Sequence, residues 1–435
     1  MFAKKPNRLA PVGIIPESVG NEIKGLGPRK PLMTRKVLII IENSTYGADP
    51  RVRNEALALC ANGYEVTVLC PRYAGFVRGY EVMEGVRVYR HPQIKHRGTR
   101  GGYLWEYSCS LFWEFLYTWW IWLRHGFDVI QGCNPPDSIF LVALPFKLLG
   151  VKYVFDHHDA NPELYVTKYN KKGFLYKALV ALEKLTYRFS DVVMATNASY
   201  KELALTRGGL APEDVFIVRN GPQEAFVGVP PNLALKHGKP YLVGYVGHMD
   251  VQDGLDILLD VAQQLKGRGR QDVHFTCVGT GPQLDTLREM VRSKNLGEMV
   301  NFTGWIPDQD LLAILATADV CVNPDRPSQM NDISTMIKIM EYMALGKPIV
   351  QFDSKEGRFS AQEASLYSNT RNQVNDFADK ILWLLDRPEE RKRMGEFGRS
   401  RIEKELAWRH SVPNLLAAYE RAFGNGSAQG GADRS

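Results

Sequence analysis

Residues 331–348 read NDISTMIKIMEYMALGKP, and this stretch says most about the fold and the ligand of the chain. Its polar start leads directly into a helix that carries one carboxylate, Glu341, and ends in Gly-Lys-Pro. A helix N-terminus presents free N–H groups and the positive end of the helix dipole, so the backbone around Ser334 and Thr335 can bind a diphosphate. Glu341 follows about two turns later, ~10 Å along the axis, which is roughly the distance from a diphosphate to the ribose of the same nucleotide.

Lys338 lies one turn before Glu341 and can offer a positive charge to a phosphate on the same face of the helix. The same residues also suit an ordinary amphipathic helix in which Lys338 and Glu341 form an ion pair. This segment alone leaves both interpretations open.

Strand and helix patterns alternate along most of the chain. Short β-branched runs at 36–42, 64–70, 86–91, 128–132, 152–157, 192–196 and 215–219 predict strands, and a second alternating set runs from about 241 to 352. This order is typical of parallel, doubly wound α/β sheets. With 435 residues, of which 45% are hydrophobic and 23% charged, the chain can bury two separate cores.

Four further segments accompany 338–350 (KIMEYMALGKPIV) in an order and spacing that a known family shares. They are VRNGP (218–222), GYVGHMDVQDGLDILL (244–259), HFTCVGTGPQLDTL (274–287) and VNFTGWIPDQDLLAILATADVCVNP (300–324). Together these segments resemble the C-terminal half of family 4 retaining glycosyltransferases, which have the GT-B fold. In 134–137 (NPPD), 155–165 and 357–367 the chain is similar to bacterial members that build cell-surface polysaccharides and lipid-linked sugars.

The resemblance implies a GT-B chain, in which two Rossmann-like doubly wound domains face a central crevice. We expect a flexible N-terminal extension at 1–33, an acceptor-binding domain at 34–228, a nucleotide-sugar-binding domain at 238–395, a helix at 396–423 that crosses back to the first domain, and a disordered tail at 424–435.

Net charge and cysteine usage limit the partners and the cell compartment that we expect for the protein. The formal net charge of +6 suits an anionic nucleotide-sugar, a membrane surface or a nucleic acid equally well. The ordered nucleotide-site motifs argue against a nucleic-acid partner. Six cysteines without a CxxC pair indicate reduced thiols, and the N-terminus lacks a secretory apolar core. We therefore expect a cytoplasmic protein, with the inner face of the cell membrane as a peripheral location.

The resemblance assigns roles to two carboxylates near the opening motif. It implies that Glu341 binds the ribose and that Asp332 contacts the donor sugar or the leaving phosphate. The family pattern often has two glutamates separated by seven residues, but here Ile333 holds the first place and Asp332 stands beside it. Asp332 equally suits a helix cap.

Turns after the strands of the second domain supply the other expected donor contacts. Gly279 and Gly281 let a backbone pass close to a ligand, although they also suit a plain strand-to-helix turn. Gly304 is implied to bind the base through its main chain, and Trp305 either covers that base or is buried. The expected nucleotide-sugar contacts are completed by Gly47, Arg53, Arg219, His248, Ser334, Thr335 and Met336.

The loop 244–254 departs from the family, in which many members place an Arg and a Lys there to hold the diphosphate. His248 and Asp253 fill those places here. We expect Lys338, the amides of 334–336 and Arg219 to replace them.

The first domain is expected to supply the acceptor side. His158 follows an apolar strand at the place where family members hold a histidine that contacts the transferred sugar. Asp159 and Glu163 are expected acceptor contacts, or in the case of Glu163 a charge at a helix start. Arg51 and Arg53 can face the ligands or solvate a helix start. The HHD at 157–159 also suits part of a metal site, but no further ligand set lies nearby in sequence.

The resemblance implies metal-independent transfer of a sugar with retention, in which amides, the helix dipole and Lys338 stabilise the departing diphosphate. The implied donor is a nucleotide-diphosphate sugar, no other cofactor is expected, and the acceptor is a saccharide or a polyprenyl-linked sugar. Asp308 and Asp310 match the DxD of metal-using transferases, but we expect one of them to cap a helix. The alternative function is a GT-B epimerase, or another nucleotide-sugar enzyme with the same diphosphate site.

The segment 103–123, YLWEYSCSLFWEFLYTWWIWL, is an unusual helix. Its polar residues fall at steps of four and form one stripe, while aromatic residues cover the remaining surface. The polar residues are Glu106, Ser110, Glu114 and Thr118. A spanning helix does not place two glutamates in a bilayer without a reason. The segment is therefore a buried helix, or one whose aromatic face meets a membrane interface with Lys95, Arg97 and Arg100 near anionic headgroups.

Overall fold

The computed structural model describes residues 35–73, 75–93, 100–222, 229–369 and 372–424. The expected extension at 1–33, nearly all of the expected tail, Lys95, Arg97 and the side chain of Arg100 lie outside the described residues. The chain divides into two compact units. Unit 1 comprises Met1–Pro162, Lys171–Val218 and Val412–Ser435, and unit 2 comprises Glu163–Asn170 and Arg219–Ser411.

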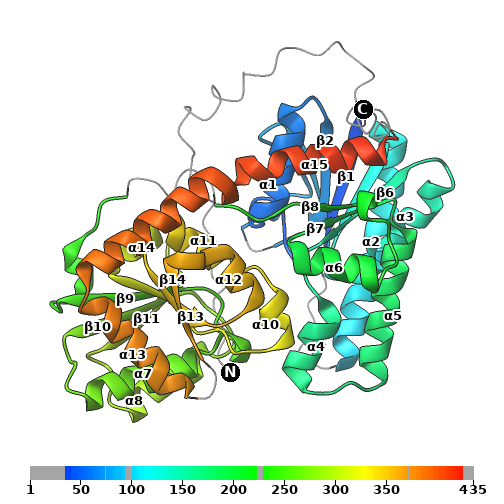
Figure 1. Ribbon diagram of the computed structural model, residues 1–435. Helices are drawn as coiled ribbons and strands as arrows, with labels where there is room; N and C mark the ends of the chain where they lie inside the picture. The colour runs from blue at the N-terminus through cyan, green and yellow to red at the C-terminus, as the bar shows by residue number, and fades with distance from the viewer. Residues whose placement is uncertain (1–34, 74, 94–99, 223–228, 370–371, 425–435) are drawn as a thin grey trace. The chain divides into compact units, whose positions relative to one another are not determined.

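Unit 1 contains an eight-stranded sheet in the order β3-β4-β2-β1-β5-β6-β7-β8 (Figure 1). Its strands are β1 (Lys36–Ile41), β2 (Glu65–Pro71), β3 (Tyr80–Met83), β4 (Val86–His91), β5 (Val129–Cys133), β6 (Lys152–His157), β7 (Val192–Ala195) and β8 (Val215–Ile217). All neighbours pair in parallel except β3 and β4. The predicted strands of this unit are confirmed, but β3 was missed because it is a short edge strand with alternating exposure.

The helices of unit 1 follow from local sequence signals. α1 (Pro50–Ala61) begins at Asp49, whose carboxylate accepts a 3.0 Å hydrogen bond from the Val52 amide, and Pro50 takes the first turn. The others are α2 (Arg100–His125), α3 (Phe140–Lys147), α5 (Phe174–Phe189) and α6 (Ala198–Thr206). α4 (Asn161–Tyr169) belongs mostly to unit 2, and α15 (Trp408–Ala422) passes from unit 2 into unit 1.

The long helix α2 packs against β2, β4 and α3 with its polar stripe turned inward. Ser110, Glu114 and Thr118 are 2%, 1% and 0% exposed, whereas Trp105 and Phe112 are 61% and 58% exposed. The helix is therefore inverted relative to the usual pattern, in which the apolar face meets the core. Among the described residues, no helix has both the length and the apolar character needed to span a membrane.

Unit 2 contains a six-stranded parallel sheet in the order β11-β10-β9-β12-β13-β14 (Figure 1). Its strands are β9 (Tyr241–Val246), β10 (Val273–Val278), β11 (Val300–Gly304), β12 (Val320–Asn323), β13 (Ile349–Phe352) and β14 (Ser365–Ser368). Its helices are α7 (Leu255–Gly267), α8 (Leu284–Ser293), α9 (Asp308–Thr317), α10 (Gln329–Ile333), α11 (Ile337–Ala344), α12 (Lys355–Ala361), α13 (Gln373–Leu385) and α14 (Pro388–Arg401). The second doubly wound sheet that the sequence predicts is thus present.

The opening motif folds as two helices and not as one. α10 ends at Ile333, the chain is extended at Ser334 and Met336, and α11 starts at Ile337. α11 ends at Ala344 with Leu345 as its C-cap residue, and Gly346 adopts φ +67°, a conformation that is strained for a residue with a side chain. The Ser334–Met336 link therefore leads into the first turn of α11, as the sequence suggests.

Candidate functional site

Lys338, in the first turn of α11, has a buried acidic partner. Its ammonium lies 2.7 Å from the carboxylate of Asp325, which follows β12, and 4.9 Å from the ring centroid of Tyr245 on β9. The second oxygen of Asp325 is buried without a hydrogen-bond partner among the described residues. The alternative that Lys338 forms an i,i+3 ion pair with Glu341 is therefore wrong, because the Lys338 ammonium pairs with Asp325.

The loop after β9 brings bare backbone to the same place. A side chain on Gly247 would begin 3.4 Å from the Lys338 ammonium. His248 is exposed, and its carbonyl accepts a 2.8 Å hydrogen bond from the Tyr245 hydroxyl. Asp253 accepts a hydrogen bond from the Asp250 amide and completes a capping box. The main chain of His248 and the side chain of Asp253 thus hold the loop in shape.

Glu341 lies one turn further along α11 and is partly buried. Burial raises the pKa of its carboxyl from 4.5 to about 7, with Asp308 adding to the shift and Lys338 opposing it. A carboxyl poised near neutrality can accept hydrogen bonds from a diol once a ligand supplies donors in place of water. Asp308 and Asp310 lie in the first turn of α9, and Pro307 is its N-cap residue, so the expectation that one of them caps the helix is wrong.

The Ser334–Met336 link is tied to its surroundings by side-chain bonds. The Ser334 hydroxyl donates to the Met330 carbonyl at 2.7 Å. Thr335 and Arg219 both approach the carboxylate of Glu356 at 3.5 Å, and Met336 is the N-cap residue of α11. Arg219 also lies 4.1 Å from the ring centroid of Phe359. The structure thus brings Arg219 and Thr335 together, as partners of one buried acid.

Asp332 is exposed within α10, where Ser328 caps the helix. Its carboxylate accepts a 2.8 Å hydrogen bond from the Lys355 amide at the start of α12. Asp332 therefore binds the first amide of α12, whose N-cap residue is Ser354, and does not cap the helix that the sequence suggests. It also lines a cavity of about 320 Å³, together with Asn323, Asp325, Pro327, Ser328, Gln329, Asn331, Met336, Phe352, Asp353 and Ser354.

The GxG turn after β10 is shaped by a neighbouring loop. A side chain on Gly279 would begin 1.9 Å from the Gly247 carbonyl, and one on Gly281 would begin 2.4 Å from that of Met249. Both glycines leave room for the backbone of the neighbouring loop, and this close approach explains them without a ligand. Gly304, at φ +75°, ends β11, and Trp305 beside it is 45% exposed, so a buried Trp305 is excluded.

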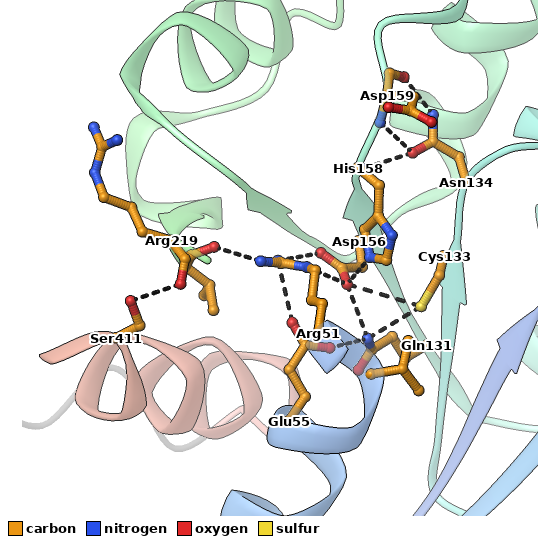
Figure 2. Close-up of polar contacts among 12 residues, drawn as sticks. Arg51, Glu55, Gln131, Cys133, Asn134, Asp156, His158, Asp159, Arg219 and Ser411 are labelled. Carbon is orange, nitrogen blue, oxygen red and sulfur yellow. Dashed lines mark hydrogen bonds and ion pairs between the residues drawn. The ribbon is translucent and has the colours of Figure 1, made fainter. Parts of the chain in front are cut away.

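Unit 1 holds a second polar cluster, centred on a buried ion pair at the ends of β5 and β6 (Figure 2). The Arg51 guanidinium binds Asp156 through two hydrogen bonds of 3.0 and 2.5 Å and donates to the Val218 carbonyl at 2.7 Å. His158 Nε2 lies 2.5 Å from Asp156. Burial alone would raise the pKa of Asp156, but Arg51 and His158 hold it below its usual range. Burial opposes protonation of His158, yet Asp156 raises its pKa.

A chain of further contacts fixes this ion pair. Glu55 lies 3.1 Å from Arg51, and burial raises its pKa to about 8 although Arg51 opposes the shift. Gln131 donates to Glu55 at 2.7 Å and to Asp156 at 3.2 Å, and it accepts from the Tyr419 hydroxyl of α15. Arg51 is thus a buried positioning residue, and neither of the exposed roles expected for it holds.

The NPPD and HHD motifs meet in this unit. The Asn134 side-chain oxygen accepts hydrogen bonds from the amides of His158 and Asp159, at 2.7 and 3.1 Å. Its amide group donates to Asp137 and to the Asp159 carbonyl, both at 2.7 Å. Glu163, which belongs to unit 2, is buried in the first turn of α4. Asn134 therefore holds the backbone that carries His158.

The remaining predicted residues of the N-terminal half lie near β3. Arg53 makes an ion pair with Glu84 and donates a 2.8 Å hydrogen bond to it. Gly47 adopts φ +99°, and a side chain there would begin 2.8 Å from the Phe76 ring. Arg53 thus has a protein partner, and Gly47 serves a tight turn.

Sequence reasoning missed Cys133 and Asp325. Cys133 pairs with Asp156 across β5 and β6, so Cys133, Asp156 and His158 form a possible metal-ligand group. Cys133 and Asp156 are 23 residues apart, and only the register of β5 against β6 brings them together. All six cysteines are free, as predicted.

Both halves of the chain match known glycosyltransferase families. Residues 46–221 match the family described as "Glycosyl transferase 4-like domain", and residues 240–387 match "Glycosyl transferases group 1". A glycogen synthase from Mycobacterium tuberculosis is 23% identical over 384 residues, which cover 83% of this chain and 88% of that protein.

A second relative is a GDP-mannose-dependent monoacylated alpha-(1-6)-phosphatidylinositol monomannoside mannosyltransferase from Corynebacterium glutamicum, which is 28% identical over 173 residues (39% of this chain and 45% of that protein). A sucrose-phosphate synthase structure from Thermosynechococcus elongatus covers 90% of this chain and 99% of its own, with 18% identity and a TM-score of 0.72. The two sheets are thus those of the GT-B fold, and the family matches together cover more than half of the chain. The protein belongs to the glycosyltransferases of the GT-B fold, in the group 1 and 4-like family.

Proposed function

We propose that this enzyme moves a sugar, with retention, from a nucleotide-diphosphate sugar to a lipid-linked saccharide in cell-surface polysaccharide synthesis. The observation that carries the donor assignment is that Lys338 and Glu341 lie on successive turns of α11. Lys338 offers an ammonium, and Glu341 offers a carboxyl with a pKa of about 7. The GDP-mannose dependence of the Corynebacterium glutamicum relative supports a nucleotide-sugar donor.

In this proposal the donor is held by unit 2. The Lys338 ammonium meets the diphosphate while Asp325 and Tyr245 keep it in place. The positive end of the α11 dipole favours the same anion. Glu341 accepts hydrogen bonds from the ribose diol. As the sugar–phosphate bond breaks, negative charge grows on the leaving diphosphate, and the fixed positive groups stabilise it more than they stabilise the ground state.

On the acceptor side, Asp156 is held by Arg51 and orients His158. Burial and Arg51 oppose protonation of His158, but the contact with Asp156 raises its pKa. A fixed imidazolium can donate a hydrogen bond to a hydroxyl of the transferred sugar. A phosphate oxygen of the leaving group takes the acceptor proton, so the reaction needs no protein base. Asp159 and Glu163 remain the acceptor contacts that we propose.

The lipid-linked acceptor is supported by the outward aromatic face of α2. Trp105, Phe112, Trp120 and Leu123 are all exposed on this helix. Trp and Phe on one face of a helix favour the boundary between lipid headgroups and acyl chains. We infer a peripheral location on the cytoplasmic side of the cell membrane, and the relative from Corynebacterium glutamicum acts on a phosphatidylinositol monomannoside.

Replacing Trp105 and Phe112 by serine should reduce sedimentation with anionic lipid vesicles while leaving Tm unchanged. Both side chains are more than half exposed, so their loss removes lipid contacts and few core contacts. Trp119→Ser is the matched control on the same helix. Its ring lies 4.5 Å from that of Phe146, so its loss should lower stability by about 3–5 kcal/mol. Unchanged vesicle binding of the Trp105 and Phe112 variant would reject the membrane face.

Transfer activity should survive an excess of EDTA, because Lys338 and the α11 dipole neutralise the diphosphate. The rate is measured with and without chelator, with Tm recorded in parallel. A rate that falls at unchanged Tm, and returns only with added Mg²⁺ or Mn²⁺, would show a catalytic metal.

The proposed function is tested in two steps. Thermal shifts with UDP, GDP and ADP identify the base, and a panel of sugars on that base is then incubated with a bacterial lipid extract. Mass spectrometry should find a glycosylated lipid, and NMR should find the anomeric configuration of the donor retained in the product. Conversion of the donor to an isomer without an acceptor would favour the epimerase alternative. Inversion at the anomeric carbon would reject the retaining mechanism.

A further inference from the structure

A buried cluster outside the proposed donor and acceptor contacts is formed by Glu42, His91 and Glu114 in unit 1. Glu42 directly follows β1, His91 is the last residue of β4, and Glu114 lies in the middle of α2. Their exposed fractions are 3%, 0% and 1%. One ligand atom from each lies within 4.8 Å of the other two, and His91 Nε2 is 3.2 Å from Glu42 Oε2.

The polar atoms that face this cluster lack hydrogen-bond partners. Within the part of the chain that the structure describes, this holds for both oxygens of Glu114, for Glu42 Oε2 and for His91 Nε2. A buried polar group without a partner costs about 1–3 kcal/mol, and a charged one costs more. Four such atoms at one point form a buried set of polar ligand atoms that the described protein residues leave unsatisfied.

The orientation of the histidine identifies the kind of occupant. His91 Nδ1 lies 3.0 Å from the Pro92 carbonyl, which accepts a hydrogen bond only if Nδ1 carries the proton. Nε2 then presents its lone pair to the two glutamates. A histidine that binds a metal through one nitrogen typically donates the other N–H to a carbonyl or carboxylate.

We propose that Glu42, His91 and Glu114 bind a divalent transition-metal ion, for which Zn²⁺ is the best match. One imidazole nitrogen and two carboxylates are ligands that Zn²⁺ takes at ~2.0–2.2 Å. Around a tetrahedral ion such ligand atoms lie roughly 3.3 Å apart, close to the 3.2 Å between His91 and Glu42.

The ion explains why α2 is inverted. Ser110 and Thr118 lie one turn to either side of Glu114, and their buried hydroxyls also lack partners among the described residues. Bound by Glu114, the metal fastens the polar stripe of α2 to the ends of β1 and β4. The aromatic face then has to point outward. The role of the ion is therefore structural, and it acts on the stability of unit 1.

A shared proton is the competing explanation. Burial, the negative charge of Glu42 and a side-chain hydrogen bond with Glu42 raise the pKa of Glu114 well above its usual range. One proton shared between the two carboxylates would make that hydrogen bond and remove their repulsion. That arrangement leaves Nε2 of His91 facing the pair and predicts no metal.

The test uses the full chain without an affinity tag, dialysed against buffered ZnCl2. Elemental analysis should find one tightly held Zn²⁺ per chain, and added Zn²⁺ should raise the Tm of metal-stripped protein. Glu114→Gln keeps the shape of the side chain and should weaken Zn²⁺ binding at least ~10-fold. Glu106→Gln, two turns earlier on α2, is the matched control and should bind like the parent protein. Cys133→Ser controls for the other group of possible metal ligands, formed by Cys133, Asp156 and His158.

Co²⁺ in the unmutated protein gives a second measurement that does not depend on folding of a variant. A site of nitrogen and oxygen ligands gives visible d–d bands without a thiolate charge-transfer band, whereas a site with Cys133 shows that band. Three results would each overturn the proposal: no tight Zn²⁺ in the parent protein, undiminished binding by a folded Glu114→Gln variant, or a thiolate band. Zinc removal should lower Tm, and Mg²⁺ should not restore it, which separates this ion from a catalytic one.

Discussion

Replacing Glu341 by glutamine should lower kcat/KM for the donor roughly 10- to 150-fold. A hydrogen bond to a charged group contributes about 1.5–3 kcal/mol, and each 1.36 kcal/mol is tenfold in rate. The neutral amide keeps the shape of the side chain but loses the charge that accepts from the ribose diol. The measurement is kcat and KM with the donor that the thermal-shift screen identifies, together with calorimetric affinity for its nucleoside diphosphate.

The same variant should be more stable than the parent protein at pH 8, but not at pH 5. The pKa of Glu341 is about 7 in the folded chain against an ordinary value of 4.5. The fold therefore favours the protonated carboxyl, and this contribution is complete below pH 4.5 and is lost as the pH rises through 7. Glutamine does not titrate, so it avoids that loss. In a domain of this size 1 kcal/mol shifts Tm by roughly 2–4 °C, which is measurable.

Two results would contradict this assignment of Glu341. Normal nucleotide affinity together with a normal transfer rate would remove it from the donor site. A Tm difference that is the same at pH 5 and pH 8 would show that the carboxyl does not titrate near neutrality.

Replacing Lys338 by methionine should weaken binding of the nucleoside diphosphate ~10- to 100-fold and that of the nucleoside much less. The ammonium is assigned to the diphosphate, and charge-assisted hydrogen bonds of this kind contribute about 1.5–3 kcal/mol. The variant should also lose about 3–5 kcal/mol of stability, because Asp325 is left buried and unpaired. Isothermal titration with both ligands and thermal unfolding measure the two effects.

The double variant Lys338→Met with Asp325→Asn separates the two roles. The amide removes the unpaired charge, so stability should return towards that of the parent protein while the diphosphate affinity stays low. If the diphosphate affinity returned with the stability, Lys338 would serve only to neutralise Asp325. Equal weakening for nucleoside and nucleoside diphosphate would lead to the same conclusion.

The sequence by itself determined the order of the elements and the fold class. Strand runs such as 36–42 and 152–157 are local signals, because a short β-branched run between turns carries its own preference. The motif at 331–348 likewise placed Lys338 and Glu341 on successive turns, since helix geometry fixes their spacing. The short edge strand β3 was not predicted, because its side chains alternate between exposed and partly exposed and none is buried.

Only the tertiary structure decided which charges meet. Lys338 and Asp325 are 13 residues apart, and Arg51 and Asp156 are 105 residues apart. No local pattern joins such pairs, because parallel strands bring distant segments to one edge of a sheet. The sequence left Arg51 facing the ligands or solvating a helix start, whereas the fold makes it a buried positioning residue.

The orientation of α2 shows the same limit. Periodicity at 103–123 revealed a polar stripe and an aromatic face, but the usual preference for burying apolar surface gives the opposite orientation. The stripe faces inward, where Glu114 lies beside Glu42 and His91, which follow or end β1 and β4. Periodicity thus showed the two faces of the helix, and only the tertiary structure decided which one is buried.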